Sequence, residues 1–483
     1  MKDRPMNEAV IQKTAKRCKE RGIVIPTFSQ QMHPEQIPDS IKKKLPGIGL
    51  WDVNPLNLFR ISWKNDVKSG LYGDVNTVEI PREITGTKAR VIGLVGKYFP
   101  TGAHKVGAAF GCLVPRLVTG EFDPETQKAV WPSTGNYCRG GAFDCALLDC
   151  TSVAILPEGM SRERFEWLHK IGAEVIATPG CESNVKEIYD KCWEIKKTRK
   201  DAIIFNQFEE FGNSSWHYHV TGNAVEEAFR KASGGKGRLA AYVSSTGSAG
   251  TISAGDYLRK VAPGVRVAAT EALQCPTLLM NGFGDHRIEG IGDKHVPWVH
   301  NVRNTNAVVA VDDENTMRVL RLFNDPAGRK ALLRQGVSEE VLNQLPLLGI
   351  SSICNMLAAI KMAKYFEFGS DDVIMTIFTD SAEMYQSRLG ELTKERGAYN
   401  DVQAEVDLER YLRGVGTDNM KELGYYDQKA LHNLKYFTWV EQQGRTAEEL
   451  RELWDPEFWD RKFSELPQWD QKIKQFNERV AAL

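Results

Sequence analysis

Short apolar segments alternate with helix-like segments from about residue 90 to residue 390. The apolar segments predicted as strands are residues 89–94, 152–156, 174–178, 202–206, 239–244, 266–271 and 373–379. Helical patterns lie between most of them, and this alternation is typical of parallel sheets flanked by helices. A chain of 483 residues is long enough for two or three domains with cores of this kind. The sequence therefore predicts an α/β fold.

A lysine opens one of the predicted helices. Lys105 follows the run Thr-Gly-Ala-His at residues 101–104 and precedes small and apolar residues at 106–110. In a dry environment the ammonium form is disfavoured, and the free amine can form a Schiff base with an aldehyde such as that of pyridoxal phosphate. Taken alone, the position is more typical of a lysine whose amine reaches solvent at a helix start. Two further segments favour the nucleophile.

The first of these segments, residues 243–252, has the pattern of a strand end, a loop of small residues and a helix start. Bare N–H groups at such a loop, together with the positive end of the helix, bind phosphate. The loop has neither the Gly-Lys-Ser/Thr ending of a nucleotide P-loop nor the G-x-G-x-x-G pattern, so a monophosphate fits better than a nucleotide. An ordinary tight turn is the alternative.

The second segment, residues 131–137, precedes another apolar helical pattern. Ser133 and Thr134 supply hydroxyls and Asn136 an amide at the start of that helix. These groups suit a substrate carboxylate and a ring hydroxyl. Taken alone, the segment is more typical of a plain Ser/Thr helix cap.

In this order, the segments resemble the fold-type-II pyridoxal-phosphate enzymes (tryptophan synthase β-like), and specifically the cysteine synthase / cystathionine β-synthase family. The resemblance runs from about residue 54 to residue 389. Further motifs that carry it lie at residues 54–60, 157–161, 172–175, 206–208, 221–222, 288–292, 349–352 and 379–385. The Thr-Gly-Ala-His-Lys run is closer to tryptophan synthase β-chains. Their "ETGAGQHG" segment is absent, so we do not expect an enzyme that uses indole.

The resemblance implies a set of site residues. Lys105 would be the Schiff-base lysine and the base at Cα, and Ser381 would lie beside the pyridine nitrogen. The other implied cofactor-binding residues are His104, Asn136, Gly247, Ser248, Ala249, Gly250 and Thr251. The implied substrate residues are Ser133, Thr134, Gly135, Tyr137 and Gln207. We expect no metal site.

Several residues depart from the family pattern. Tyr137 stands where a small threonine is usual and is expected to fill or reshape the substrate pocket. Arg139 either binds a second negative charge or, the reading we favour, lies solvated on a helix face. Ala249 replaces a loop glycine, which predicts a negative φ. The His217-x-His219 pair is expected in a solvated turn, and Cys138 is expected as a buried small hydrophobe rather than a redox-sensitive thiol.

The neutral hydroxyl of Ser381 would make a weaker electron sink than a carboxylate, which favours loss of a group from Cβ. We therefore expect β-replacement on O-acetylserine, serine or a similar amino acid through an aminoacrylate, with a thiol or sulfide as nucleophile. One alternative is a β-elimination lyase of the cysteine desulfhydrase or serine/threonine ammonia-lyase type. A catalytically silent scaffold subunit is the alternative of another class. The presence of Lys105, Asn136, the phosphate loop and Ser381 argues against the scaffold.

The resemblance and the patterns divide the chain into regions. We expect a helical N-terminal extension at 1–50, with a helix at 7–21, and a large cofactor-binding domain at 51–130 and 236–390. A small mobile substrate domain is expected at 131–235, with the cofactor in the cleft, and a helical extension at 391–483 with a capping box at 446–449. We expect this tail to pack on its own core or on a second subunit; a regulatory ligand site is the alternative.

Bulk composition limits the partners. Charge is balanced, with a formal net charge of −1, so no nucleic acid is expected, and no apolar run predicts a membrane span or a secretion signal. Nine scattered cysteines are typical of reduced thiols, which favours a cytoplasmic location. The resemblance implies a homodimer.

Overall fold

Seven strands form the larger sheet of the computed structural model, which describes residues 6–133, 135–181, 184–292 and 294–483. In order across the sheet they are β13 (Met420–Glu422), β11 (Ala307–Val311), β10 (Arg266–Ala272), β9 (Arg238–Ser245), β12 (Asp372–Phe378), β4 (Arg90–Val95) and β3 (Thr77–Ile80). The five central strands run parallel, and the two edge strands are antiparallel to their neighbours. The predicted parallel sheet is confirmed; β3, β11 and β13 were not predicted.

Helices cover both faces of this sheet because alternate side chains of each strand point to opposite sides. In β12, Val373 and Met375 join one apolar cluster, whereas Ile374 and Phe378 join another. The first cluster includes residues of α10 (Gly222–Ser233) and α11 (Ser253–Val261), and the second includes residues of α13 (Asp313–Asn324) and α16 (Ile350–Tyr365). The sheet is therefore buried on both sides.

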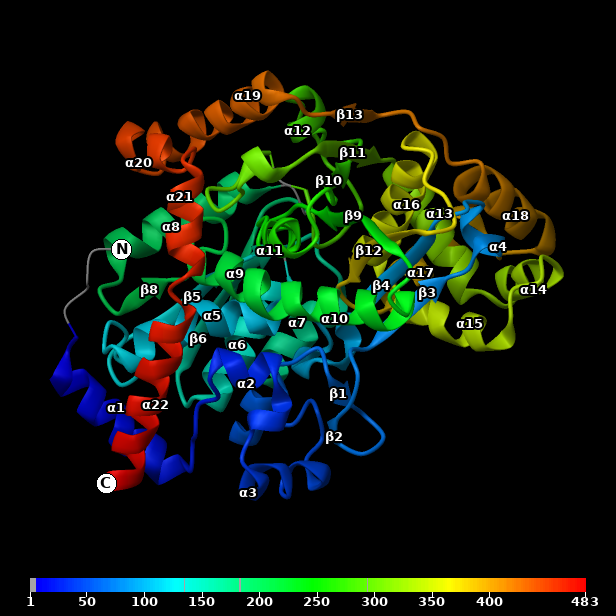
Figure 1. Ribbon diagram of the computed structural model, residues 1–483. Helices are drawn as coiled ribbons and strands as arrows, with labels where there is room; N and C mark the ends of the chain where they lie inside the picture. Colours follow the sequence, from blue (N-terminus) through cyan, green and yellow to red (C-terminus); the bar gives the residue numbers. More distant parts are fainter. Residues whose placement is uncertain (1–5, 134, 182–183, 293) are drawn as a thin grey trace.

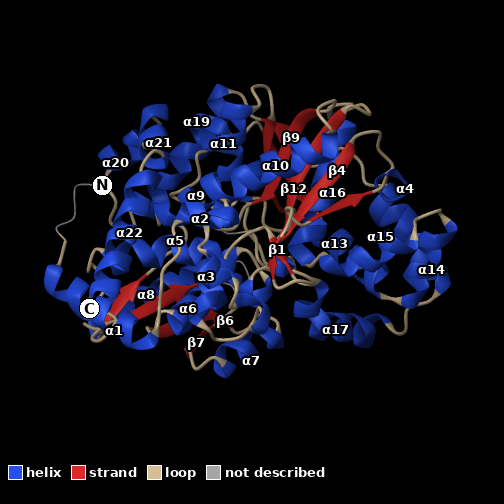
Figure 2. Cartoon of the chain, turned by 60° about the horizontal axis from the view of Figure 1, so that its bottom comes forward, coloured by secondary structure: helices blue, strands red, loops and turns tan. Residues whose placement is uncertain are grey.

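A second sheet of four parallel strands lies apart from the first (Figure 2). In order they are β7 (Glu174–Thr178), β6 (Thr151–Pro157), β5 (Lys128–Pro132) and β8 (Ala202–Ile204). One face packs on α8 (Val185–Thr198), and the other on α5 (Lys105–Val118) and α6 (Asn136–Leu147). β5 was not predicted, because its last residues were assigned to the substrate loop.

The first and last helices of the described chain lie side by side (Figure 1). Helix α1 (Glu8–Arg21) is capped by Asn7 and matches the helix predicted at 7–21. Helix α22 (Leu466–Ala482) runs along α1. The side chain of Asn477 bonds to both backbone groups of Ile25. The N-terminal extension is thus fixed by the C-terminal one.

The C-terminal tail packs on the chain's own core. Its last part contains the helices α19 (Tyr425–Lys435), α20 (Ala447–Glu452), α21 (Pro456–Phe463) and α22. Trp439, Trp459 and Phe463 cluster with Tyr189 and Trp298 of the core. The predicted capping box at Thr446 is present, with its side chain accepting from the Glu449 N–H. The packing that we favoured for the tail is confirmed.

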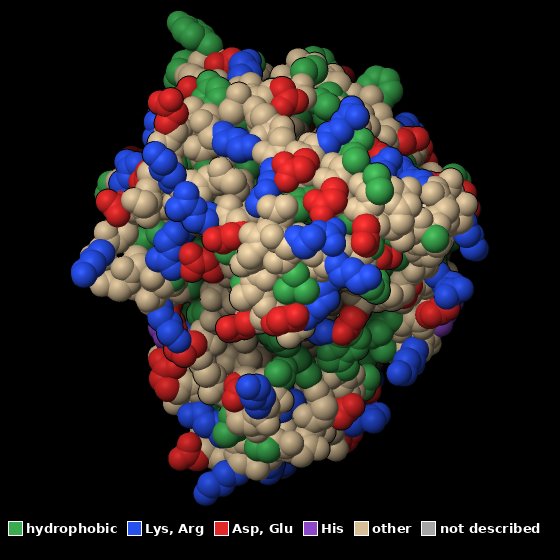
Figure 3. All heavy atoms as spheres, turned by 90° about the vertical axis from the view of Figure 1, so that its right-hand side faces the viewer, with side chains coloured by type: hydrophobic (Ala, Val, Ile, Leu, Met, Phe, Trp, Pro, Cys, Tyr) green, Lys and Arg blue, Asp and Glu red, His purple; other side chains and the backbone are tan. Residues whose placement is uncertain are grey.

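The remaining α-helices are α2 (Phe28–Met32), α3 (Asp39–Lys42), α4 (Arg82–Thr85), α7 (Arg162–Lys170), α9 (Phe211–Trp216), α12 (Thr277–Met280), α14 (Pro326–Arg334), α15 (Glu339–Gln344), α17 (Gln386–Arg396) and α18 (Asp401–Val406). β1 (Asn65–Asp66) and β2 (Leu71–Tyr72) form a short hairpin. Among the described residues no single helix is long and apolar enough to cross a membrane, although Glu339–Leu347 and Ile350–Tyr365 pass that test as a pair bent by 119°. Acidic and basic side chains are interspersed on the face shown in Figure 3.

Candidate active site

Helix α5 begins at Lys105, whose side chain reaches the loop that follows β9. Its Nζ donates to Ser248 Oγ at 3.1 Å. The preceding turn is tight, because Thr101 and Gly102 both have left-handed φ values, 71° and 72°. The turn and the buried helix behind it fix a primary amine against the loop.

The predicted phosphate loop, residues 247–251, connects β9 to α11. Ser248 Oγ also accepts from Asn213 Nδ2 at 3.0 Å. A Cβ on Gly250 would overlap the Asn213 amide, so a larger residue there would displace the Asn213 side chain. His104 Nε2 lies 3.2 Å from Thr251 Oγ1. A short loop of this kind before a helix presents backbone N–H groups to an anion.

The backbone at Ala249 contradicts our expectation of a negative φ. Its φ is 57°, in the left-handed region. A residue with a Cβ costs about 1 kcal/mol or more there. The tight connection between β9 and α11 places position 249 in the left-handed region even though the residue there is alanine and not glycine. The loop therefore keeps the conformation of a glycine loop with an alanine in it.

Asn136 begins α6, and both ends of its amide are held. Its Nδ2 donates to Asp380 Oδ2 at 2.7 Å, and its Oδ1 accepts from Arg139 Nη1 at 3.2 Å. The Arg139 side chain is fully buried and also donates to the Thr101 carbonyl. Our favoured assignment of Arg139 to a solvated helix face is therefore wrong. Burial, followed by the nearby Arg164 charge, lowers the pKa of Arg139 to about 10.

A buried charge network joins α7 to the residues around α17. Arg164 Nη1 lies 2.9 Å from Glu289 Oε2, and both side chains are almost fully buried. Arg164 Nη2 donates to the Tyr385 hydroxyl, which donates to Asp380 Oδ2 at 2.7 Å. Burial raises the pKa of Asp380, while Arg164, Asn136 and Tyr385 favour its charged form. The network thus links Arg164 of α7 to Asp380, the residue that accepts the hydrogen bond from Asn136.

One small cavity brings several of the predicted residues together. It is lined by Lys105, Ser133, Asn136, Tyr137, Gln207, Phe208, Gly247, Ser248, Gly290 and Thr379. Phe208, Gly290 and Thr379 were missed as site residues, although each lies in or beside a motif that resembles the family. Burial raises the pKa of the Tyr137 hydroxyl well above its usual value, so Tyr137 is a neutral wall.

Other predicted residues lie outside that lining. Gly135 lies against the Arg164 guanidinium, and Ser381 is buried at the start of the 3-10 turn Ala382–Tyr385. Ala249, Gly250 and Thr251 lie deeper in the phosphate loop, with His104 beside Thr251. Thr134 is outside the described residues. The roles assigned to all these residues remain predictions.

The histidine pair at 217 and 219 contradicts our expectation of a solvated turn. His217 is fully buried, and its ring lies 5.1 Å from that of His104. His219 is half-buried and bonds to the Phe463 carbonyl. Burial holds the pKa values of His104 and His217 well below their usual value, so both rings are neutral. Cys138 is buried, as expected.

The residues present fit an aldehyde cofactor that carries a phosphate. A primary amine stands beside a strand-to-helix loop of the anion-binding type. Three buried polar atoms nearby have no hydrogen-bond partner within the part of the chain that the structure describes: Asn213 Oδ1, Ser351 Oγ and Asp380 Oδ1. Ser351 lies next to Gly290 of the cavity wall. No group of three or more His, Cys, Asp or Glu side chains suited to a metal ion occurs in the described ranges.

Comparison with known proteins agrees with this chemistry. The family described as "Pyridoxal-phosphate dependent enzyme" matches residues 97–380. Cysteine synthase B of Campylobacter jejuni is 29% identical over 289 residues, which are 60% of this chain and 87% of that protein. A cysteine synthase of Staphylococcus aureus is 30% identical over 289 residues, covering 60% of this chain and 84% of the relative.

Solved structures show the same fold. Cysteine synthase from Entamoeba histolytica superposes with a TM-score of 0.56 at 20% identity, covering 70% of this chain and 93% of that one. The chain therefore contains nearly the whole of these smaller proteins and adds further residues to them.

Proposed function

Because the chain belongs to the pyridoxal-phosphate dependent enzyme family, we propose that it catalyses β-replacement on a serine-type amino acid such as O-acetylserine or serine. The observation that carries the proposal is the 3.1 Å contact between Lys105 Nζ and Ser248 Oγ, at the wall of a cavity that Ser133 and Asn136 also line. The cysteine synthases among its relatives support this reaction.

When bound, pyridoxal phosphate supplies an aldehyde that captures amines and a ring that withdraws the electron pair left at Cα. Lys105 would hold the aldehyde carbon, and the N–H groups of residues 247–251 would hold the phosphate. His104 is neutral and lies beside Thr251, so it would hydrogen-bond there without adding charge. Ser381 would meet the ring nitrogen, and Asn136 the ring oxygen.

Lys105 would also be the base that takes the proton from Cα, because its amine lies at the wall of the cavity that would hold the substrate. Ser133, Thr134, Gly135 and Gln207 bind and orient the substrate carboxylate and side chain. The neutral Tyr137 ring closes the apolar side of the cavity. Fixed donors that orient the breaking bond supply much of the rate enhancement in such a site.

A β-elimination lyase is the second candidate. Tyr137 lines the cavity where the family resemblance implies a small side chain, so it restricts the space for an incoming thiol. A site that cannot admit the nucleophile would release the eliminated product as a keto acid and ammonia. The two reactions share every step up to loss of the β-substituent.

Product analysis separates the candidates. The purified protein is incubated with O-acetylserine, serine or cysteine, with and without sulfide. Suppression of pyruvate together with a new amino acid supports β-replacement, whereas pyruvate formation that ignores sulfide supports the lyase. A protein that has no visible cofactor absorbance and takes up no added pyridoxal phosphate would contradict both and leave the scaffold alternative.

We also propose the organisation around the site. Residues 131–235 form the small mobile domain, and residues 51–130 and 236–390 form the large one. The buried Arg164–Glu289 pair supports a closed arrangement, because it joins the two. We propose a cytoplasmic homodimer; all nine cysteines are free thiols, which is typical of a reducing compartment.

A further inference from the structure

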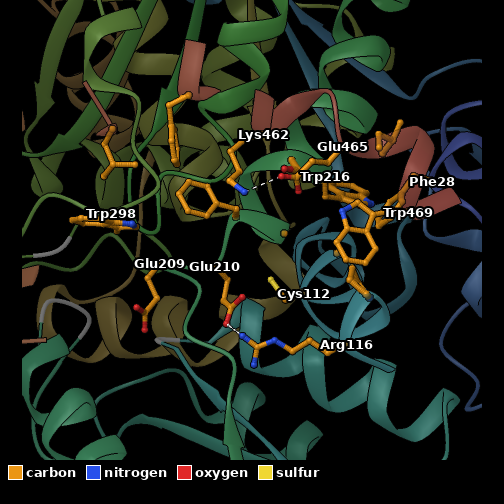
Figure 4. A pocket seen from close by; sticks show the side chains of 18 of the residues that line it. Phe28, Cys112, Arg116, Glu209, Glu210, Trp216, Trp298, Lys462, Glu465 and Trp469 are labelled. Carbon is orange, nitrogen blue, oxygen red and sulfur yellow. Dashed lines mark hydrogen bonds and ion pairs between the residues drawn. The ribbon is translucent and has the colours of Figure 1, made fainter. Parts of the chain in front are cut away.

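Residues 205–210, which connect β8 to α9, contribute to two cavities. Gln207 and Phe208 line the catalytic cavity, whereas Glu209 and Glu210 line a larger cavity of about 510 Å³. The larger cavity lies between the core and the helices α20, α21 and α22, and the two glutamates lie side by side in it (Figure 4). The segment therefore meets the catalytic site on one side and the C-terminal extension on the other.

On the catalytic side, the segment is tied to the loop that meets Lys105. The Asn213 amide of α9 donates to the Gln207 carbonyl at 2.9 Å and to Ser248 Oγ at 3.0 Å. The same hydroxyl accepts from Lys105 Nζ at 3.1 Å. Asn213 is fully buried, where hydrogen bonds are stronger than in water. A shift of the segment would therefore change the place of Gln207 relative to the reactive amine.

On the other side, Glu209 is paired with a cation of the C-terminal extension. Its Oε2 accepts from Arg445 Nη2 at 2.7 Å, and its Oε1 accepts from Asn206 Nδ2 at 3.2 Å. Arg445 is itself oriented by Glu449, 3.3 Å away, and by the Trp298 ring, whose centre lies 5.4 Å from the guanidinium carbon. The side chains of Arg445 and Glu209 are 30% and 23% exposed, so solvent screens the pair only in part. An oriented cation of this kind fixes the segment that carries its partner.

Apolar packing makes the same connection. Phe208 belongs to a buried cluster that also contains Trp439 and Trp459 of the extension. The Phe208 carbonyl accepts from the Val299 N–H at 3.2 Å, and the Trp439 indole donates to the Val296 carbonyl at 2.9 Å. The extension therefore packs against both the wall residue of the catalytic cavity and the core segment that bonds to it.

We propose that Arg445 is a positioning residue for the substrate site. Through Glu209 it fixes residues 205–210, so that Gln207 and Phe208 keep their places in the catalytic cavity. This inference rests on the proposed function, which assigns Gln207 to the substrate. Without the Arg445 charge, the partly buried Glu209 carboxylate turns toward solvent, and the segment loses its fixed position.

The effect falls on KM rather than on kcat. Gln207 and Phe208 lie next to Glu209 in the chain, whereas Lys105 and Ser248 belong to α5 and to the loop after β9. A less ordered segment therefore weakens binding of the substrate, while proton transfer by Lys105 continues in the complexes that form.

Steady-state kinetics of the full chain loaded with pyridoxal phosphate test the proposal. Arg445→Gln should raise the KM of the amino-acid substrate at least fivefold and leave kcat within twofold of wild type. Glu209→Gln should do the same, and the double variant should lie within twofold of either single variant, because both act through one contact. Arg451→Gln, at an exposed ion pair of α20, is the matched control and should leave KM unchanged. A wild-type KM in the Arg445 variant, or a double variant whose effect is the product of the two single effects, overturns the proposal.

Hydrogen exchange gives a readout that does not depend on activity. The amide protons of Phe208, Glu209 and Glu210 are all bonded to Asn206 within the segment. In Arg445→Gln they should exchange at least fivefold faster than in wild type, whereas those of β12 in the core should not change. Unchanged exchange in the segment overturns the proposal whatever the KM, because Arg445 would then not act through it. A wild-type protein that turns over no amino acid, but whose Arg445 variant exchanges faster in the segment, rejects the proposed function and supports the fixing of the segment by Arg445.

Discussion

Replacement of Gly140 by alanine tests whether the packing of α6 on α5 positions Lys105. A Cβ at position 140 would lie 2.7 Å from Val106 Cα, 2.8 Å from Val106 N and 3.0 Å from the carbonyl carbon of Lys105. All three atoms belong to the backbone, so no side chain can rotate away. The two helices must therefore move apart at the residue that carries the reactive amine.

The structure sets the size of the effect. Ordinary contacts of a Cβ begin near 3.4 Å, so the three distances fall short by about 0.4 to 0.7 Å, and the helices must separate by about 0.5 Å on average. Overpacking of this kind costs about 1–3 kcal/mol, of which the better helix propensity of alanine offsets about 1 kcal/mol. A misplacement of about 1 Å in an active site costs about 100-fold in rate. A misplacement of about 0.5 Å therefore corresponds to a loss of roughly tenfold in kcat/KM.

The assay compares kcat/KM for the amino-acid substrate with stability in urea. Gly390→Ala is the matched control, because Gly390 lies within helix α17 with open space where the Cβ would be. We expect the Gly140 variant to lose about tenfold in kcat/KM and at most about 2 kcal/mol of stability, and the control to keep full activity. Activity within twofold of wild type in the Gly140 variant would refute this account of how Lys105 is positioned.

Three further substitutions test other parts of the molecule. Lys105→Ala should abolish the cofactor's visible absorbance and nearly all turnover, because it removes both the covalent anchor and the base; near-normal rates would contradict the assignment. Glu289→Gln should lower the free energy of unfolding by about 3 kcal/mol or more, because it removes the buried carboxylate charge that lies 2.9 Å from the Arg164 guanidinium; a loss below 1 kcal/mol in urea titrations would contradict this. Burial raises the pKa of Asp256 to about 7. The folded state therefore binds this proton more tightly than the unfolded chain, and the contribution of Asp256 to stability falls as pH rises from about 4 to about 7. Asp256→Asn should reduce that fall, measured as the difference in Tm between pH 5 and pH 7.5; an equal difference in both proteins would reject this.

The backbone of the core was predictable because its signals are local. The predicted strand at 174–178 coincides with β7, and the strand, loop and helix around Ser248 follow from a change of apolar period over a few residues. Lys105 was found in the same way, from the turn before it and the small residues after it. Such signals require no knowledge of distant contacts.

The partners of the site came from elsewhere in the chain and were missed. Asn213 reaches Ser248 from α9, and Asp380 reaches Asn136 across 244 residues. For Arg139, the composition of the helix around it indicates burial. Apart from Asn136 and Asp144, the rest of α6 is small or apolar, which is typical of a helix that is enclosed all round. The sequence contains no signal for the left-handed φ of Ala249, since alanine normally avoids that region.

The pairing of α1 with α22 has a consequence for synthesis of the chain. The ion pair between Glu8 and Arg479 spans 471 residues, and Ile11 and Ala15 share an apolar cluster with Ile473 of α22. During translation α1 leaves the ribosome long before its partner is made, so its apolar stripe waits in solution. Contacts of such separation form slowly, which makes docking of these two helices a late event in folding. A nascent chain stalled before residue 466 would therefore offer that stripe to chaperones or to other nascent chains.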